Sequence, residues 1–148
     1  MSKKIYNIVI VISEFNKVVT DGLLDGAKKA FNDNNGKELT IIKVPGAFEI
    51  PAATKKVASE LNPDAIVTLG AIIKGETKHF DYISAECSRA IQELTLKFNI
   101  PIMFGVLTTE NAEQAIERSS RNNKGYEVME AAFKMINTFK VIESSSEK

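Results

Sequence analysis

Cysteine and histidine each occur only once in this 148-residue sequence, as Cys87 and His79. One cysteine cannot form a disulfide within the chain, and one residue of each kind is too few for a dedicated Cys/His zinc site. The first residues also lack the apolar core and the small-residue cleavage site of a secretion signal. We therefore expect a reducing, cytoplasmic location.

Long apolar runs and an excess of one charge are absent too. The longest unbroken apolar run, Ile8 to Ile12, has five residues, whereas a membrane-spanning helix needs about 20. The 19 basic residues are scattered and are balanced by 19 acidic ones, while nucleic-acid binders usually carry a basic excess or stripe. We expect neither a membrane nor a nucleic acid as a partner.

The composition, 44% hydrophobic and 26% charged, is that of a globular protein. No repeat or linker divides the chain, so we expect one domain over residues 1–148, with about 142–148 as a frayed tail. Apolar periodicity predicts alternating strands and helices, which favour an α/β fold with a mostly parallel four-stranded sheet covered on both faces. The strands are expected over residues 5–12, 39–44, 65–69 and 102–107, and the helices over 19–31, 48–61, 82–98, 109–118 and 127–141.

In such a sheet, ligands bind beyond the carboxyl ends of the strands, here loops 14–16, 45–49, 70–79 and 108–109. The loop over 70–79 holds two glycines and a threonine just before a predicted helix, so its N–H groups and hydroxyl can hold a phosphate. The alternative is a glycine-bearing turn with solvated lysines. His79 can transfer protons near neutral pH, or it is an ordinary surface histidine.

Other residues near these loops also allow two interpretations. Glu49 can bind sugar-like hydroxyls or cap a helix, and Phe15 can stack on a flat heterocycle or join the core. Asn16 is expected to be an N-cap and Phe104 a core residue. Arg118 is expected to be solvated, unless it faces a neighbouring subunit and binds phosphate there. These residues alone favour a generic phosphate- or nucleotide-binding module.

Six segments, taken together and in this order, carry a family resemblance: residues 14–16, 44–51, 69–82, 104–110, 114–118 and 123–125. With them the sequence resembles the 6,7-dimethyl-8-ribityllumazine synthase family from about residue 5 to residue 141. The resemblance implies a flavodoxin-like three-layer α/β/α sandwich. It also implies the penultimate step of riboflavin biosynthesis, in which 5-amino-6-(D-ribitylamino)uracil condenses with 3,4-dihydroxy-2-butanone 4-phosphate. No metal or redox cofactor is expected.

The resemblance also implies site residues. By similarity, His79 donates or accepts protons and Phe15 stacks on the pyrimidine. The pyrimidine and ribityl groups would further contact Ala47, Phe48, Glu49, Ala71, Ile72, Ile73, Lys74 and, from a neighbouring subunit, Phe104. The phosphate would be held by Gly75, Glu76, Thr77 and, again across a subunit interface, Arg118.

The family places each site between adjacent subunits, which implies a homopentamer or a 60-subunit shell. The sequence departs from the family pattern at two places. Glu14 stands where many members have arginine, which alters the local charge but leaves Phe15 and Asn16 in place. The stretch over 119–122 is shorter than in many bacterial members, and because it joins the last two helices, the choice between pentamer and shell stays open.

Two alternatives share the implied fold. An archaeal-type riboflavin synthase would convert two lumazines into riboflavin and would not use the phosphate residues. A non-catalytic flavin or lumazine carrier, or a shell protein, would keep the stacking ring of Phe15 but would not need His79.

Overall fold

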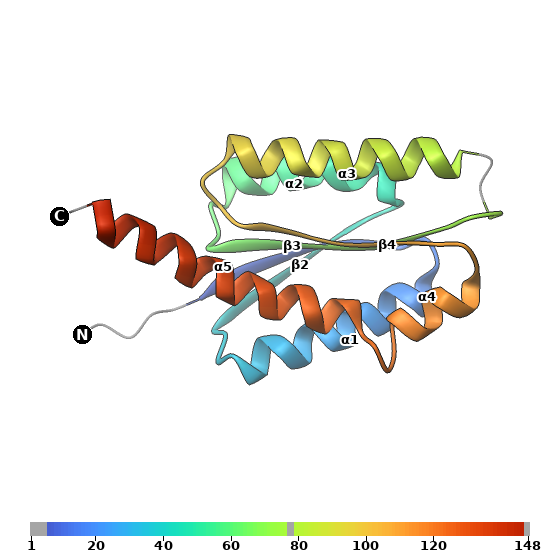
Figure 1. Ribbon diagram of the computed structural model, residues 1–148, viewed down its shortest axis with the longest axis horizontal. Coiled ribbons are helices and arrows are strands. Elements are labelled where there is room, and N and C mark those ends of the chain that lie inside the picture. The colour runs from blue at the N-terminus through green and yellow to red at the C-terminus, as the bar shows by residue number, and fades with distance from the viewer. Residues whose placement is uncertain (1–5, 77–78, 147–148) are drawn as a thin grey trace.

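Strands and helices alternate along the chain in the computed structural model, which describes residues 6–76 and 79–146 (Figure 1). Among these residues no helix combines the length and apolar character needed to cross a membrane. The elements are β1 (Asn7–Ser13), α1 (Lys17–Asp33), β2 (Glu38–Val44), the 3-10 turn η1 (Ala47–Glu49), α2 (Ile50–Glu60), β3 (Ala65–Ile73), α3 (Phe80–Lys97), β4 (Ile102–Thr109), α4 (Ala112–Arg118) and α5 (Lys124–Ser146).

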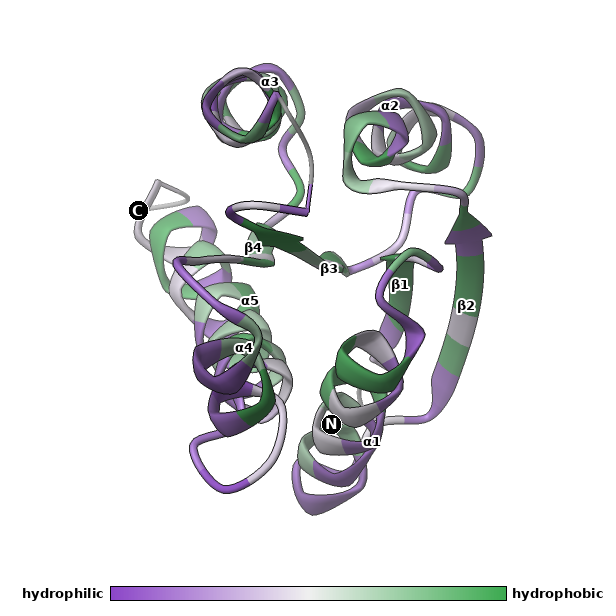
Figure 2. Cartoon of the chain, turned by 90° about the vertical axis from the view of Figure 1, so that its right-hand side faces the viewer, coloured by the Kyte–Doolittle hydropathy of each residue, from purple (hydrophilic) through white to green (hydrophobic). Residues whose placement is uncertain are grey.

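The four strands form one parallel sheet in the order β2-β1-β3-β4. Helices α2 and α3 cover one face of this sheet, and α1, α4 and α5 cover the other (Figures 1 and 2). The predicted α/β fold with a four-stranded parallel sheet and helices on both sides is therefore confirmed. Because all strands are parallel, their carboxyl ends meet at one edge of the sheet, together with the loops that follow them.

The core has two halves, one on each face of the sheet, and β1 contributes to both. Ile8, Ile10 and Ile12 pack against α1 and α5, whereas Val9 and Val11 pack against α2 and α3. All five are at most 4% exposed, and burying each side chain contributes about 1.5–3 kcal/mol. The two-sided apolar pattern of this segment correctly predicted a buried parallel strand.

Strand β3 is longer than predicted, because it continues through Ile73 instead of ending at residue 69. Its last residues pair with β4, from Gly70 opposite Val106 to Ile73 opposite Thr109. Gly70 was interpreted as the start of a loop. It lies inside the strand, where a Cβ atom would come within 2.8 Å of the Ser13 hydroxyl oxygen, so this position favours glycine.

Several helix boundaries also differ from the prediction. The helix expected over 48–61 begins at Ile50, after the 3-10 turn, and α4 begins after Asn111, whose side chain accepts a hydrogen bond from Gln114 N at 2.9 Å. Helix α5 extends over Lys124–Ser146. Residues 142–146 are thus helical where a frayed tail was expected, although all are exposed; residues 147–148 lie outside the described part.

Candidate active site at the carboxyl ends of the strands

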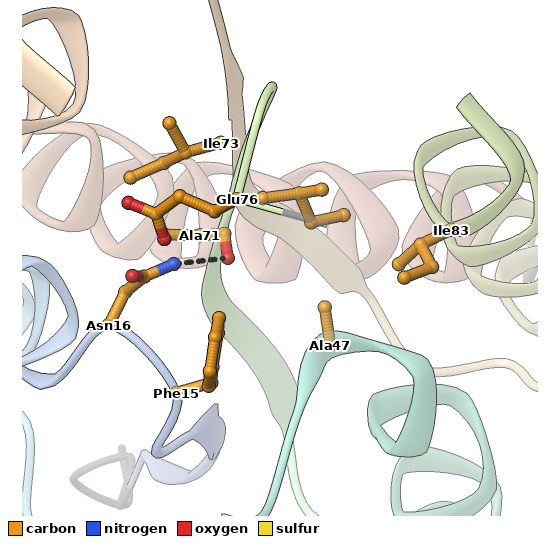
Figure 3. A pocket seen from close by; sticks show the side chains of 8 residues that line it. Phe15, Asn16, Ala47, Ala71, Ile73, Glu76 and Ile83 are labelled. Carbon is orange, nitrogen blue, oxygen red and sulfur yellow. Dashed lines mark hydrogen bonds between the residues drawn. The ribbon is translucent and has the colours of Figure 1, made fainter. Parts of the chain in front are cut away.

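A pocket of about 270 Å³ lies where β1 and β3 end, between the loops that follow β1, β2 and β3 (Figure 3). Its wall is mostly apolar, with one amide and one carboxylate. The lining consists of Phe15, Asn16, Ala47, Ala71, Ile72, Ile73, Glu76 and Ile83. The sequence placed six of these residues in the site, all except Asn16 and Ile83.

Phe15 presents its ring at the mouth of this pocket. Its side chain is 57% exposed, so the alternative that placed it in the core is wrong. The loop that carries it is held against the end of β2, because Glu14 N donates to Val44 O at 2.8 Å and Phe15 N donates to Pro45 O at 3.1 Å. A flat ring held in this way can stack on a heterocycle.

Asn16 occupies the N-cap position of α1 but does not cap the helix with its side chain. Its backbone is left-handed, with φ 64°, a conformation that asparagine tolerates better than most residues. The side-chain amide instead donates to Ala71 O at 3.4 Å across the pocket wall (Figure 3). Asn16 is therefore the N-cap residue of α1, as predicted, but its side chain makes no capping hydrogen bond and joins the pocket instead.

Ala47 and Ile83 close the opposite side of the pocket (Figure 3). The Ala47 carbonyl accepts a hydrogen bond from Cys87 Sγ at 3.5 Å. Cys87 is buried on the apolar face of α3, as predicted, and burial raises the pKa of its thiol to about 11. The thiolate is therefore not formed near neutral pH, and Cys87 supports the wall rather than acting as a nucleophile.

Phe48 and Glu49 follow Ala47 on the 3-10 turn and are both exposed. Neither is part of the pocket lining. Glu49 occupies the N-cap position of α2, as its interpretation as a capping acid predicted, but its side chain makes no hydrogen bond to the start of that helix.

Ala71, Ile72 and Ile73 form the pocket wall from the end of β3, where all three are buried. The chain then leaves the sheet at Lys74, whose N–H donates to Thr109 O at 2.9 Å. The Lys74 ammonium lies 3.6 Å from the Glu110 carboxylate, and both side chains are more than half exposed. Such a surface pair contributes about 0–1 kcal/mol, so a ligand can displace it at little cost.

The turn after Lys74 depends on glycine, because Gly75 has φ +92°. Glu76 N donates to Ile73 O at 3.2 Å, and the Glu76 carboxylate lines the pocket on the side of Asn16 (Figure 3). In this conformation the Glu76 N–H is already hydrogen-bonded to Ile73 O. The Glu76 carboxylate would also repel a phosphate. Thr77, the third expected phosphate residue of this loop, lies outside the described residues.

His79 lies immediately before α3 and is exposed. Its carbonyl accepts a hydrogen bond from the N–H of Ile83 at 2.9 Å, so it sits one helical turn from a residue of the pocket wall. The imidazole is not itself part of the described lining.

Phe104 lies on the edge strand β4, opposite Thr68. It was expected in the core, but it is only partly buried and packs against the half of the core under α2 and α3. The described pocket lining does not include it.

Arg118 ends α4 and was interpreted as a solvated charge, but it is paired. One guanidinium nitrogen donates to Asn122 O at 2.8 Å and another to the Glu127 carboxylate at 3.1 Å. The Arg118 hydrogen bond holds the pKa of Glu127 below its ordinary value. Arg118 also borders a separate, more open hollow of about 620 Å³ beside α4, and within the described residues it is not part of the first pocket.

The described residues thus bring together only part of the predicted site. Asn16 and Ile83 were missed, since the first was interpreted as a cap and the second as a core residue of its helix. Over residues 6–76 and 79–146, no group of three His, Cys, Asp or Glu side chains is placed to hold a metal ion.

Comparison with known proteins places this chain in one family. The sequence profile of the family described as 6,7-dimethyl-8-ribityllumazine synthase matches residues 6–140. Proteins of that name from Campylobacter hominis and Campylobacter jejuni are each 50% identical over 137 residues, covering 90% of this chain and 88% and 89% of their own. The protein of that name from Campylobacter fetus is 48% identical over 141 residues, covering 93% of this chain and 90% of its own. The chain therefore belongs to the 6,7-dimethyl-8-ribityllumazine synthase family.

Proposed function

We propose that this chain condenses 5-amino-6-(D-ribitylamino)uracil with 3,4-dihydroxy-2-butanone 4-phosphate. The products are 6,7-dimethyl-8-ribityllumazine, inorganic phosphate and two molecules of water. The observation that carries the proposal is the pocket at the carboxyl ends of β1 and β3, with the exposed ring of Phe15 at its mouth, in a chain that matches this family over residues 6–140.

The uracil substrate occupies the pocket with its ring on Phe15. The backbone of Ala71, Ile72 and Ile73 and the ammonium of Lys74 bind the edge of the pyrimidine. The ribityl chain extends over the 3-10 turn, along Ala47, Phe48 and Glu49. The Glu49 carboxylate accepts hydrogen bonds from its hydroxyls, which its exposure on the surface allows.

His79 is the proposed catalytic residue. The amine of the uracil attacks the ketone and forms an imine with loss of one water, and elimination then expels phosphate. Ring closure releases the second water. Each step moves protons, which an imidazole can donate or accept, and holding both substrates in one place supplies much of the acceleration.

The phosphate of the second substrate binds at the turn formed by Gly75, Glu76 and Thr77, together with Arg118. For the Glu76 N–H to reach this phosphate, its hydrogen bond to Ile73 O has to open.

The site is completed by a second copy of the chain. Phe104 covers the heterocycle and Arg118 binds the phosphate, both from a neighbouring subunit of a homopentamer or a 60-subunit shell. Support comes from the position of Phe104 on an edge strand and from the location of Arg118 outside the described lining of the pocket. A cytoplasmic location, inferred from the single cysteine, is part of the same proposal.

A two-substrate assay tests the proposed function. The purified protein is mixed with both substrates, and the fluorescent lumazine is followed, with each substrate alone as a control. Product formation above the uncatalysed background is expected. Riboflavin formed from lumazine alone would indicate the riboflavin synthase alternative, and binding of the uracil without turnover would indicate a carrier.

A further inference from the structure

One carboxylate lies between two cations where α4 is joined to α5. Glu127 Oε2 is 3.1 Å from the Arg118 guanidinium, and Glu127 Oε1 is 3.4 Å from the Lys124 ammonium. The two cationic side chains are 28% and 29% exposed. In the other ion pairs of the described residues, every side chain is at least 44% exposed. This cluster is therefore the most enclosed ion pairing in the described part of the chain.

The cluster fixes the orientation of Arg118 from two sides. Asn122 O accepts from one guanidinium nitrogen at 2.8 Å and Glu127 accepts from the other. A planar guanidinium held at two points has a defined plane, and it keeps further N–H donors for an anion. Lys124 adds a second positive charge, so Glu127 does not cancel the charge of Arg118 and the group of three remains net positive.

We infer that Glu127 is a positioning residue for the phosphate subsite, which acts on the butanone phosphate through Arg118 by holding the guanidinium in place before the substrate arrives. The inference rests on the proposed function, which assigns Arg118 to the phosphate. A side chain that is already ordered loses less conformational entropy on binding. A carboxylate that merely neutralised Arg118 would instead oppose phosphate binding, so the sign of its effect distinguishes the two roles.

Three substitutions at Glu127 separate position from charge. Glu127→Ala is expected to raise the KM for the butanone phosphate roughly two- to 150-fold, the range of coupling between contacting residues, with the KM for the uracil substrate nearly unchanged. Glu127→Asp keeps the charge but withdraws the carboxylate, so it is expected to behave like the alanine variant. Glu127→Gln keeps an acceptor for Arg118 without the charge, and we expect it to restore most of the affinity.

Two outcomes of this series would overturn the inference. One is an unchanged or lowered KM for the butanone phosphate in both Glu127→Ala and Glu127→Asp, which would show a purely neutralising carboxylate. The other is an equal rise in KM for both substrates, which would show a structural defect. Should Glu127→Ala fail to assemble, the other two variants alone decide. Glu127→Asp is predicted to raise the KM for the butanone phosphate, whereas Glu127→Gln is predicted to keep it near the wild-type value.

A double-mutant cycle tests whether Glu127 acts through Arg118. The double variant Arg118→Ala/Glu127→Ala should have the same KM for the butanone phosphate as Arg118→Ala alone. A higher KM in the double variant would overturn the inference. Glu117→Ala is the matched control, because Glu117 pairs with the exposed Arg121 at 3.5 Å, and we expect wild-type KM values. Wild-type protein that forms no lumazine would refute the proposed function and this inference together.

Discussion

The side-chain amide of Asn16 donates to the carbonyl of Ala71 at 3.4 Å, across a sequence separation of 55 residues. This contact joins the loop after β1 to the end of β3 and fixes the side of the pocket from which Phe15 extends. It forms because Asn16 adopts φ 64°, which turns the chain into α1 and directs the amide towards β3.

Two substitutions at Asn16 are predicted to differ in stability but to share a binding defect. Glycine accepts the left-handed backbone, whereas alanine adds strain of about 1–2 kcal/mol. We expect Asn16→Ala to unfold at lower urea concentration than Asn16→Gly, measured at one protein concentration. Both lose the bond to Ala71, so both should raise the KM for the uracil substrate. Equal stability of the two variants would show that the backbone at this position is not strained.

His79→Ala is predicted to slow lumazine formation by roughly ten- to ten-thousandfold, the range of general acid–base catalysis. The KM values should change much less than kcat, because His79 lies outside the described lining of the pocket. Steady-state kinetics with both substrates measure this. Wild-type turnover in the variant would remove His79 from the mechanism.

The location of the site could be predicted from the sequence, but part of its geometry could not. The two-sided apolar pattern of residues 8–12 indicated a buried parallel strand, and the position of ligands beyond the strand ends then followed. The conformation of Asn16 could not be predicted, because its amide finds its acceptor only once β1 and β3 are paired.

Arg118 and Gly70 show the same limit. The pairing of Arg118 with Glu127 depends on how α4 turns into α5, so a local pattern indicated only a solvated charge. Gly70 was interpreted as the start of a loop, although it lies inside β3. A glycine is favoured at this position because Ser13 of the neighbouring strand approaches closely. A local sequence pattern does not encode this contact.

Gly70→Ala is predicted to destabilise the fold by about 1–3 kcal/mol through overpacking. The new Cβ would come within 2.8 Å of Ser13 Oγ and 3.1 Å of Ile50 Cδ1. Ser13 Oγ is buried and has no hydrogen-bond partner among the described residues, so Ser13→Ala should cost little by itself and should recover part of the loss in the double variant. Urea unfolding of the wild type, the two single variants and the double variant measures the coupling between the two positions. Strictly additive losses of stability would show that the new Cβ does not clash with Ser13 Oγ.

The link between α1 and α5 predicts a specific dependence of stability on pH. The Asp33 carboxylate accepts hydrogen bonds from the Tyr126 hydroxyl at 2.8 Å and from the Lys29 ammonium at 3.0 Å. Both hydrogen bonds hold the pKa of Asp33 below its ordinary value of 3.8, and the bond from Tyr126 has the larger effect. Because this pKa is lowered in the folded state, the contribution is fully present above pH 3.8 and is lost as the pH falls through the folded-state pKa.

Asp33→Asn removes this contribution, so the variant should be less stable than the wild type near neutral pH, and the difference should shrink as the pH falls below 3.8. Unfolding midpoints of both proteins, measured across this range, test the prediction. Asp21→Asn is the control, because Asp21 pairs on the surface with Lys17 within a single helix and its loss should not separate α1 from α5. A difference between wild type and Asp33→Asn that stays constant with pH would show that the carboxylate stabilises the link without being ionised.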